Sequence, residues 1–138
     1  MGRIMSIDYG RKRVGLAVTD PLKIIATALD TVFADKVLEY IGAYIQKEAV
    51  EFFVVGLPKN LDNTDAESMA DVKPFVEELK AKFNLPVVWI DERYTSKLAM
   101  RAMIDSGVKK SERRKKENTD KISAVIILQS YLESISLK

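Results

Sequence analysis

The sequence predicts an α/β fold of three layers, with helices flanking a mixed sheet of five strands, three antiparallel and then two parallel. Two observations predict it. The first thirty residues hold three short β-rich runs joined by connections short enough for antiparallel pairing. Helical periodicity then alternates with continuous apolar runs, a pattern typical of parallel strands with crossover helices. At 138 residues we expect one domain, residues 1–138.

The three opening strands are expected at Ile4–Asp8, Val14–Thr19 and Ile24–Leu29. The first two are separated by five residues, 9–13, which include a glycine and suit a hairpin loop. Asp20-Pro21 is a turn signal ahead of the third strand. These short connections predict that the three strands are antiparallel.

The rest of the chain changes period. Two unbroken apolar runs, Phe52–Val55 and Val87–Ile90, predict buried strands. Apolar residues at helical spacing predict helices over Asp35–Glu48 with Asp35 as N-cap, Met69–Phe83, Thr95 or Ser96 to Ile104, and Asp120–Ile135. Pro74 should kink the second of these helices or mark its first turn.

The composition excludes several kinds of chemistry. The chain has no Cys and no His, so zinc knuckles, iron–sulfur clusters, cysteine nucleophiles and Ser-His-Asp catalysis are not available to it. An enzyme built from this chain would use carboxylates, Lys, Arg, hydroxyls and backbone amides, with a hard cation such as Mg²⁺ or Mn²⁺. No apolar stretch approaches the length of a membrane span, and the first residues are too polar for a signal peptide. We therefore expect a cytoplasmic protein with no membrane partner.

Positive charge is concentrated in two places. Residues 109–121 hold seven cations and only three anions, and Arg11-Lys12-Arg13 occupies the first hairpin. Such clusters favour binding to a phosphate backbone, although a solvated loop would have the same composition. The six cations that we expect to contact nucleic acid in the first cluster are Lys109, Lys110, Arg113, Arg114, Lys115 and Lys116.

Acidic residues lie at the ends of two expected strands and at the start of the last expected helix. Asp8 ends the first expected strand, Asp91-Glu92 ends the last, and Asp120 opens the final helix. Each has an ordinary explanation, as a turn residue or as a charge that favours a helix N-terminus. Together, carboxylates at one sheet edge would repel one another unless a cation bridges them. Beside basic clusters, this pattern fits a two-metal site for phosphodiester hydrolysis.

Four segments carry a resemblance to a known family. They are Ser6–Ala17 (SIDYGRKRVGLA), Val55–Pro58 (VGLP), Asp91–Ser96 (DERYTS) and Asp120–Gln129 (DKISAVIILQ). In this order and spacing the chain resembles the YqgF family, bacterial proteins of the RNase H-like, resolvase-type superfamily. The resemblance runs from residue 4 to about residue 132. One departure is Asp62-Asn63-Thr64-Asp65, where members usually have a Gly after the acid.

The resemblance implies a single RNase H-like nuclease domain with an acidic triad, Asp8, Glu92 and Asp120, that binds Mg²⁺ or Mn²⁺. Glu92 is preferred to Asp91 because it aligns better with the strand-end acid of related resolvases. Neighbouring strand residues also point to opposite faces, so only one of the two acids faces the cluster easily. Members are described as Holliday-junction resolvases or as nucleases that mature the 5′ end of pre-16S rRNA in the cytoplasm.

Other residues are expected to hold the substrate. Arg11, Lys12 and Arg13 could clamp phosphates near the metals or simply cover an exposed loop. Lys59 and Asn60 follow a buried strand and could contact the substrate backbone. Arg93 could pair with a strand-end carboxylate or with the scissile phosphate.

Three functions follow from these residues. The first is a metal-dependent endonuclease that processes the 5′ end of pre-16S rRNA in ribosome biogenesis, with precursor rRNA and ribosomal particles as partners. The second is a Holliday-junction resolvase acting on branched DNA, which we expect to work as a homodimer because the junction has two-fold symmetry. The third is a non-catalytic rRNA-binding module. The sequence does not distinguish a monomer from a homodimer.

Overall fold

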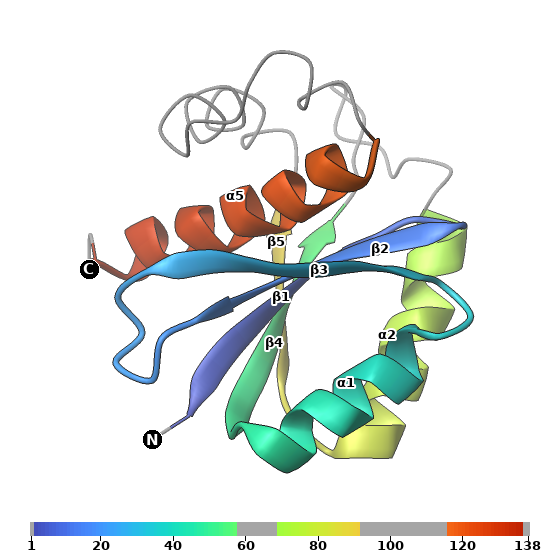
Figure 1. Cartoon of the computed structure of the whole chain (residues 1–138), viewed down its shortest axis with the longest axis horizontal. Helices are drawn as coiled ribbons and strands as arrows, with labels where there is room; N and C mark the ends of the chain where they lie inside the picture. Colours follow the sequence, from blue (N-terminus) through green and yellow to red (C-terminus); the bar gives the residue numbers. More distant parts are fainter. Residues whose placement is uncertain (1, 58–68, 92–115, 137–138) are drawn as a thin grey trace.

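The computed structural model describes residues 2–57, 69–91 and 116–136, with the first turns of the last helix described as backbone. Five strands form one sheet in the order β3-β2-β1-β4-β5 (Figure 1). The predicted mixed sheet is confirmed: β1 pairs antiparallel with β2 and β2 with β3, whereas β4 is parallel to both β1 and β5. The strands span Arg3–Tyr9 (β1), Arg13–Thr19 (β2), Ala26–Phe33 (β3), Val50–Leu57 (β4) and Val87–Asp91 (β5).

The third strand differs from the prediction, because it begins at Ala26 and runs on to Phe33. The Asp20 carboxylate accepts hydrogen bonds from the backbone N–H groups of Ile24 (2.7 Å) and Ile25 (2.8 Å). These bonds hold the two isoleucines in the β2–β3 turn, and they lower the pKa of Asp20 below its usual 3.8. Because the Asp20 side chain occupies these backbone N–H groups, β3 begins two residues later than the sequence pattern predicts.

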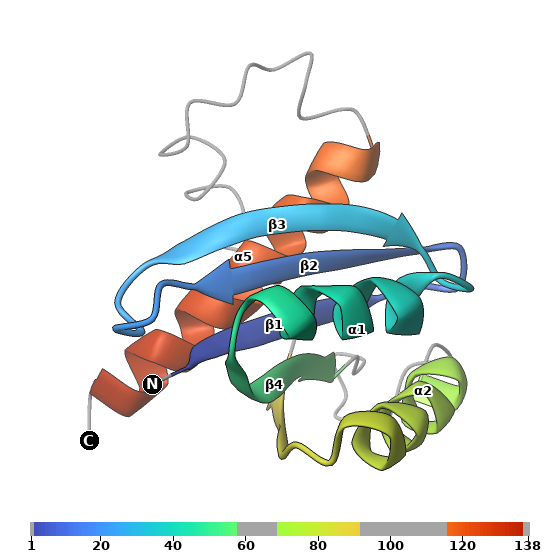
Figure 2. The same cartoon turned by 60° about the horizontal axis from the view of Figure 1, so that its bottom comes forward.

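Helices cover both faces of the sheet (Figure 2). Helices α1 (Val37–Lys47) and α2 (Met69–Phe83) lie on one face, and α5 (Lys116–Ser136) lies on the other. Asp35 was the wrong N-cap: the cap position is Lys36, which makes no capping bond through its side chain. Pro74 is inside α2. The helix expected from residue 95 or 96 to 104 lies outside the described residues.

The last helix begins at Lys116, four residues before the predicted start, so Asp120 lies one turn inside α5 and does not open it. Residues 116–119 read Lys-Glu-Asn-Thr, which has no apolar periodicity, and for this reason the hydrophobic pattern missed the first turn. None of the helices in the described ranges is both long and apolar enough to span a bilayer.

Two buried clusters hold the layers together, and they follow the alternation of side chains along the strands. Met5 and Ile7 of β1 face α1 and α2, where they pack with Ile41 and Leu79. Ile4 lies on the opposite face. There the buried cluster comprises Ile4, Ala17, Val54, Ala124, Ile127 and Leu128. Even-numbered residues of β1 therefore face α5.

Candidate active site

Asp8 lies at the carboxyl end of β1, half-buried, on the face of the sheet covered by α5. It follows Ile4 and Ser6 on that face by alternation. Its cross-strand partner on β2 is Gly15, and on β4 it lies level with Gly56, the residue after the Ile7–Val55 pair. The residues directly opposite Asp8 on both neighbouring strands are therefore glycines.

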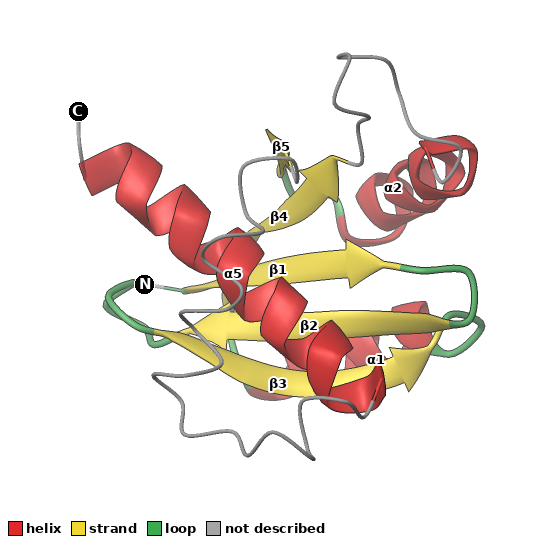
Figure 3. Cartoon of the chain, turned by 90° about the horizontal axis from the view of Figure 1, so that it is seen from above, coloured by secondary structure: helices red, strands yellow, loops and turns green. Residues whose placement is uncertain are grey.

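Ser6 connects this strand to α5. Its buried hydroxyl donates a hydrogen bond of 2.6 Å to the backbone carbonyl of Ala124. Ile4, further back on β1, packs with Ala124, Ile127 and Leu128, so β1 and α5 run in opposite directions past each other. Figure 3 shows α5 lying diagonally across the sheet.

Asp120 falls at the Asp8 end of this contact. It precedes Ala124 by four residues, a rise of about 6 Å along a helix. Asp8 follows Ser6 by two residues, a rise of about 6.7 Å along a strand. Because the two elements are antiparallel, the backbone positions of Asp8 and Asp120 lie at the same end of the sheet; the Asp120 side chain lies outside the described residues.

Alternation along β5 separates the two remaining acids. Val88 and Ile90 pack in the α5-side cluster, whereas Val87 and Trp89 pack on the α1–α2 side. Asp91 is the next residue after Ile90, so it belongs to the α1–α2 side, away from Asp8. Glu92 lies outside the described residues, as does Arg93.

The basic hairpin is only partly available for phosphate binding. The Arg11 guanidinium donates a bond of 2.6 Å from Nε to the Asp71 carboxylate of α2, so one of the predicted phosphate clamps already holds an acid. Lys12 is exposed, and Arg13 is the cross-strand partner of Phe33. Lys116 is the first residue of α5. Lys59, Asn60, Lys109, Lys110, Arg113, Arg114 and Lys115 lie outside the described residues.

Two residues near Asp8 make contacts that the sequence pattern did not predict. Ser6 is a fully buried hydroxyl inside an apolar strand, and this polar interruption was the available signal. Tyr9 stacks on Phe75 of α2 with ring centroids 4.4 Å apart. Burial, and then the nearby Asp71 and Glu78 carboxylates, raise the pKa of Tyr9 above 10.0, so its hydroxyl remains protonated at neutral pH.

The donor chemistry around Asp8 suits a hard divalent cation. The Asp8 carboxylate offers oxygen donors of the kind that hard cations prefer, and the residues directly opposite it on β2 and β4 are glycines. Within the described residues no group of three acidic or other ligating side chains comes together. Of the predicted triad, Asp8 alone has its side chain among those residues.

The fold has relatives among resolvases. Over 97% of this chain and 96% of the other, it superposes on Thermus thermophilus RuvC, solved with a Holliday junction, with a TM-score of 0.61 at 13% identity. Fowlpox virus Holliday junction resolvase gives a TM-score of 0.55 over 96% of this chain and 99% of the other, at 16% identity. The sheet order and these likenesses define an RNase H-like fold of the RuvC type, as predicted. The family model described as "RuvX: Holliday junction resolvase" matches residues 2–134, and the chain belongs to this family.

Several relatives are similar along their full length. A protein of Bacteroides thetaiotaomicron is 52% identical over 135 residues, covering 97% of this chain and 98% of that protein. One of Porphyromonas gingivalis is 49% identical over 97% and 98% of the two chains. Both carry the name "Putative pre-16S rRNA nuclease". The predicted YqgF resemblance is thereby confirmed, since the RuvX and YqgF families are one.

Proposed function

We propose that this protein is a divalent-metal-dependent endonuclease that hydrolyses phosphodiester bonds in structured nucleic acid and processes the 5′ end of pre-16S rRNA in the cytoplasm. One observation carries the proposal. Asp8 lies at the carboxyl end of the central strand between two glycines, in a chain about half identical, over nearly its whole length, to proteins that carry the name "Putative pre-16S rRNA nuclease". The carboxyl ends of parallel strands are where α/β sheets place their ligand sites.

Asp8, Glu92 and Asp120 would hold Mg²⁺ or Mn²⁺. Bound divalent cations supply an acidified water at neutral pH and neutralise charge at the leaving oxygen. Asp8 would provide a firmly held ligand, because its strand is central in the sheet and is tied to α5 through Ser6. Glu92 is favoured over Asp91 because Asp91 belongs to the other face of β5. Lys12 and Arg13, together with Lys59, Asn60, Arg93 and the cations of 109–116, would position the strand.

The test is a cleavage assay with Mn²⁺ or Mg²⁺, offering a precursor-rRNA 5′ leader and a four-way DNA junction side by side. Asp8→Asn should abolish cleavage while leaving nucleic-acid affinity within about twofold, because the change keeps the shape of the side chain and removes its charge. Asp91→Asn is the matched control, and it should retain cleavage where Glu92→Gln does not.

The outcomes separate the three functions. Metal-dependent cutting of the leader, lost in Asp8→Asn, supports rRNA processing. Cutting of the junction alone would transfer the activity to branched DNA, the substrate class in the family's description. Binding without cutting under every metal would leave a non-catalytic rRNA-binding module. Loss of cleavage in Asp91→Asn with full activity in Glu92→Gln would reverse the assignment of the β5 acid.

A further inference from the structure

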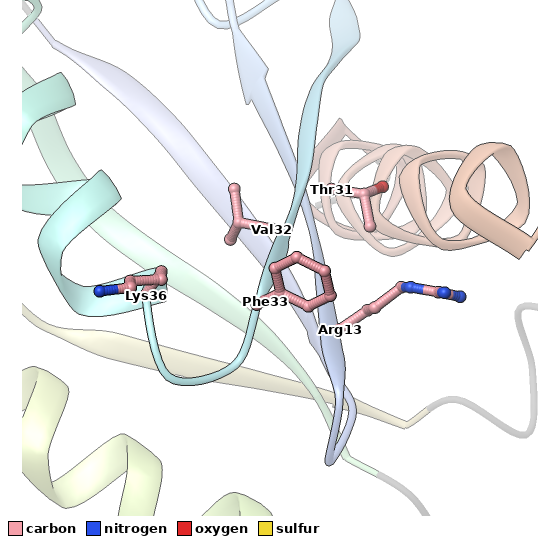
Figure 4. Close-up of a pocket in the computed structure, with 5 residues that line it drawn as sticks. All are labelled: Arg13, Thr31, Val32, Phe33 and Lys36. Atoms are coloured by element: carbon pink, nitrogen blue, oxygen red, sulfur yellow. The ribbon is translucent and has the colours of Figure 1, made fainter.

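A shallow pocket of about 270 Å³ lies beside the end of β3, lined by Arg13, Thr31, Val32, Phe33 and Lys36. This volume is below the roughly 300 to 1,000 Å³ of typical small-molecule sites. The pocket contains Phe33, an aromatic side chain that is 63% exposed. Figure 4 shows the side chains of Arg13 and Thr31 on the α5 side of the strand, with Val32 and Lys36 on the opposite side.

Phe33 and Arg13 share a face of the sheet with Asp8. The strands pair Asp8 with Gly15 and Gly15 with Thr31, and two residues further along β3 Phe33 is paired with Arg13. Two strand spacings and two residue rises place Phe33 roughly 12 Å from Asp8 between Cα atoms. That distance corresponds to about four stacked nucleotides at 3.4 Å each. A strand bound at Asp8 can therefore reach Phe33, passing Arg13 on the way.

The charges at this end of the sheet favour a polyanion. Arg11 is paired with Asp71, and Lys36 approaches Glu39 at 4.0 Å. Lys12 and Arg13 have no acidic partner among the residues that the structure describes. An exposed aromatic ring next to a cation is the pairing with which proteins hold unpaired nucleotides, since the ring stacks on a base and the cation contacts a phosphate.

We propose that Phe33 and Arg13 form a stacking platform for an unpaired base of the substrate strand, so that the protein binds single-stranded nucleic acid beside the bond it cleaves. This inference rests on the proposed nuclease function, and it narrows the substrate to one with an unpaired segment within about four nucleotides of the Asp8 site. Phe33 stacks on the base and Arg13 pairs with the adjoining phosphate.

The experiment measures binding in the Asp8→Asn protein, which cannot cleave, with a short single-stranded RNA that carries 2-aminopurine and with the duplex of the same sequence. Phe33→Ala should weaken single-strand binding about 5-fold to 150-fold and remove the fluorescence quenching caused by stacking. Phe33→Trp should restore both. Arg13→Gln should lower the slope of log affinity against log salt by about 0.7. Duplex binding should change little in Phe33→Ala.

The matched control is Ile24→Ala, because Ile24 is equally apolar and 67% exposed but lies at the opposite end of β3, in the β2–β3 turn. The platform is overturned if Phe33→Ala binds like Ile24→Ala, if Asp8→Asn binds no single strand, or if Phe33→Ala changes only the oligomeric state. Failure of the nuclease function looks different: the wild-type protein would not cleave although Phe33 still quenched the probe. Cleavage that is lost in Asp8→Asn but unchanged in Phe33→Ala would refute the stacking platform and leave the nuclease function standing.

Discussion

Burial should make the hydrogen bond from Ser6 to α5 measurable in the stability of the protein. Ser6→Ala deletes a fully buried donor whose Oγ lies 2.6 Å from the Ala124 carbonyl. The Ala124 carbonyl still accepts the hydrogen bond from the backbone N–H one turn further along the helix. The free energy of unfolding therefore falls by the net value of one hydrogen bond, about 1 kcal/mol. At about 2.1 cal/mol/K per residue, unfolding of a 138-residue chain gains roughly 0.3 kcal/mol/K, so the melting temperature should fall by about 3 °C.

Ser134→Ala is the matched control for this bond. Ser134 also lies on α5 and donates over 2.6 Å to a helix carbonyl, that of Tyr131, but it is exposed. Water replaces the lost bond there, so the melting temperature should change by less than about 1 °C. Thermal unfolding followed by circular dichroism measures both. Equal shifts in the two variants would refute the argument that burial gives the Ser6 bond its value.

The same variant tests positioning. Ser6 lies two residues before Asp8 and holds α5 four residues after Asp120, so its loss should loosen the distance between two proposed metal ligands. Under the proposed function, Ser6→Ala should raise the Mn²⁺ concentration needed for half-maximal cleavage by a few fold, at a temperature well below unfolding. Ser134→Ala should leave that concentration unchanged. An unaltered metal requirement in Ser6→Ala would limit the bond to a structural role.

Two further predictions concern the hairpin and the β2–β3 turn. A Cβ at Gly10 would lie 2.6 Å from the Arg13 carbonyl oxygen, so Gly10→Ala should destabilise the fold by about 1–3 kcal/mol in urea unfolding. The control is Gly42→Ala inside α1, where the nearest atom would be 3.7 Å from the new Cβ, and this change should stabilise the fold by about 0.4–1 kcal/mol. Equal effects of the two substitutions would contradict the clash at Gly10. Backbone hydrogen bonds lower the pKa of Asp20 below 3.8, so its carboxylate stabilises the turn above pH 3.8 and loses this effect as the pH falls through the lower pKa of the folded state. The amide NMR signals of Ile24 and Ile25 should therefore titrate with a midpoint below pH 3.8. A midpoint at or above 3.8 would refute the assignment of these bonds.

Hydrophobic period predicted the sheet and the helices well, because burial is what creates the period. β1, β2, β4 and β5 lie within a few residues of their expected bounds for this reason. The errors fall where polar groups decide the boundary. Asp20 binds the amides of the turn and moves the start of β3, while the polar residues 116–119 extend α5 beyond its apolar stripe. Neither effect leaves a trace in apolar spacing.

The candidate site shows the same division. The positions of Asp8 and Asp120 at one end of the sheet follow from strand order and helix direction, which the pattern of elements predicts. The pairing of Arg11 with Asp71, across 60 residues of sequence, could not be read from the chain, because it depends on how α2 packs beside the hairpin. Phe33 was missed for a related reason: exposure of an apolar residue at a strand end becomes visible only when the sheet is assembled.

The two faces of the sheet differ in a way that bears on function. Among the described residues, the α1–α2 face holds a buried cluster of fourteen residues, whereas the α5 face holds six around a single helix. Within the described residues, the larger buried cluster therefore lies on the side of the sheet away from Asp8. The α5 face can then carry glycines beside Asp8, a buried serine and an exposed Phe33, features that would each weaken a core. Helix α5 packs against all five strands and is tied to β1 through the buried Ser6 bond, so changes that shift α5 should alter the position of Asp120 relative to Asp8.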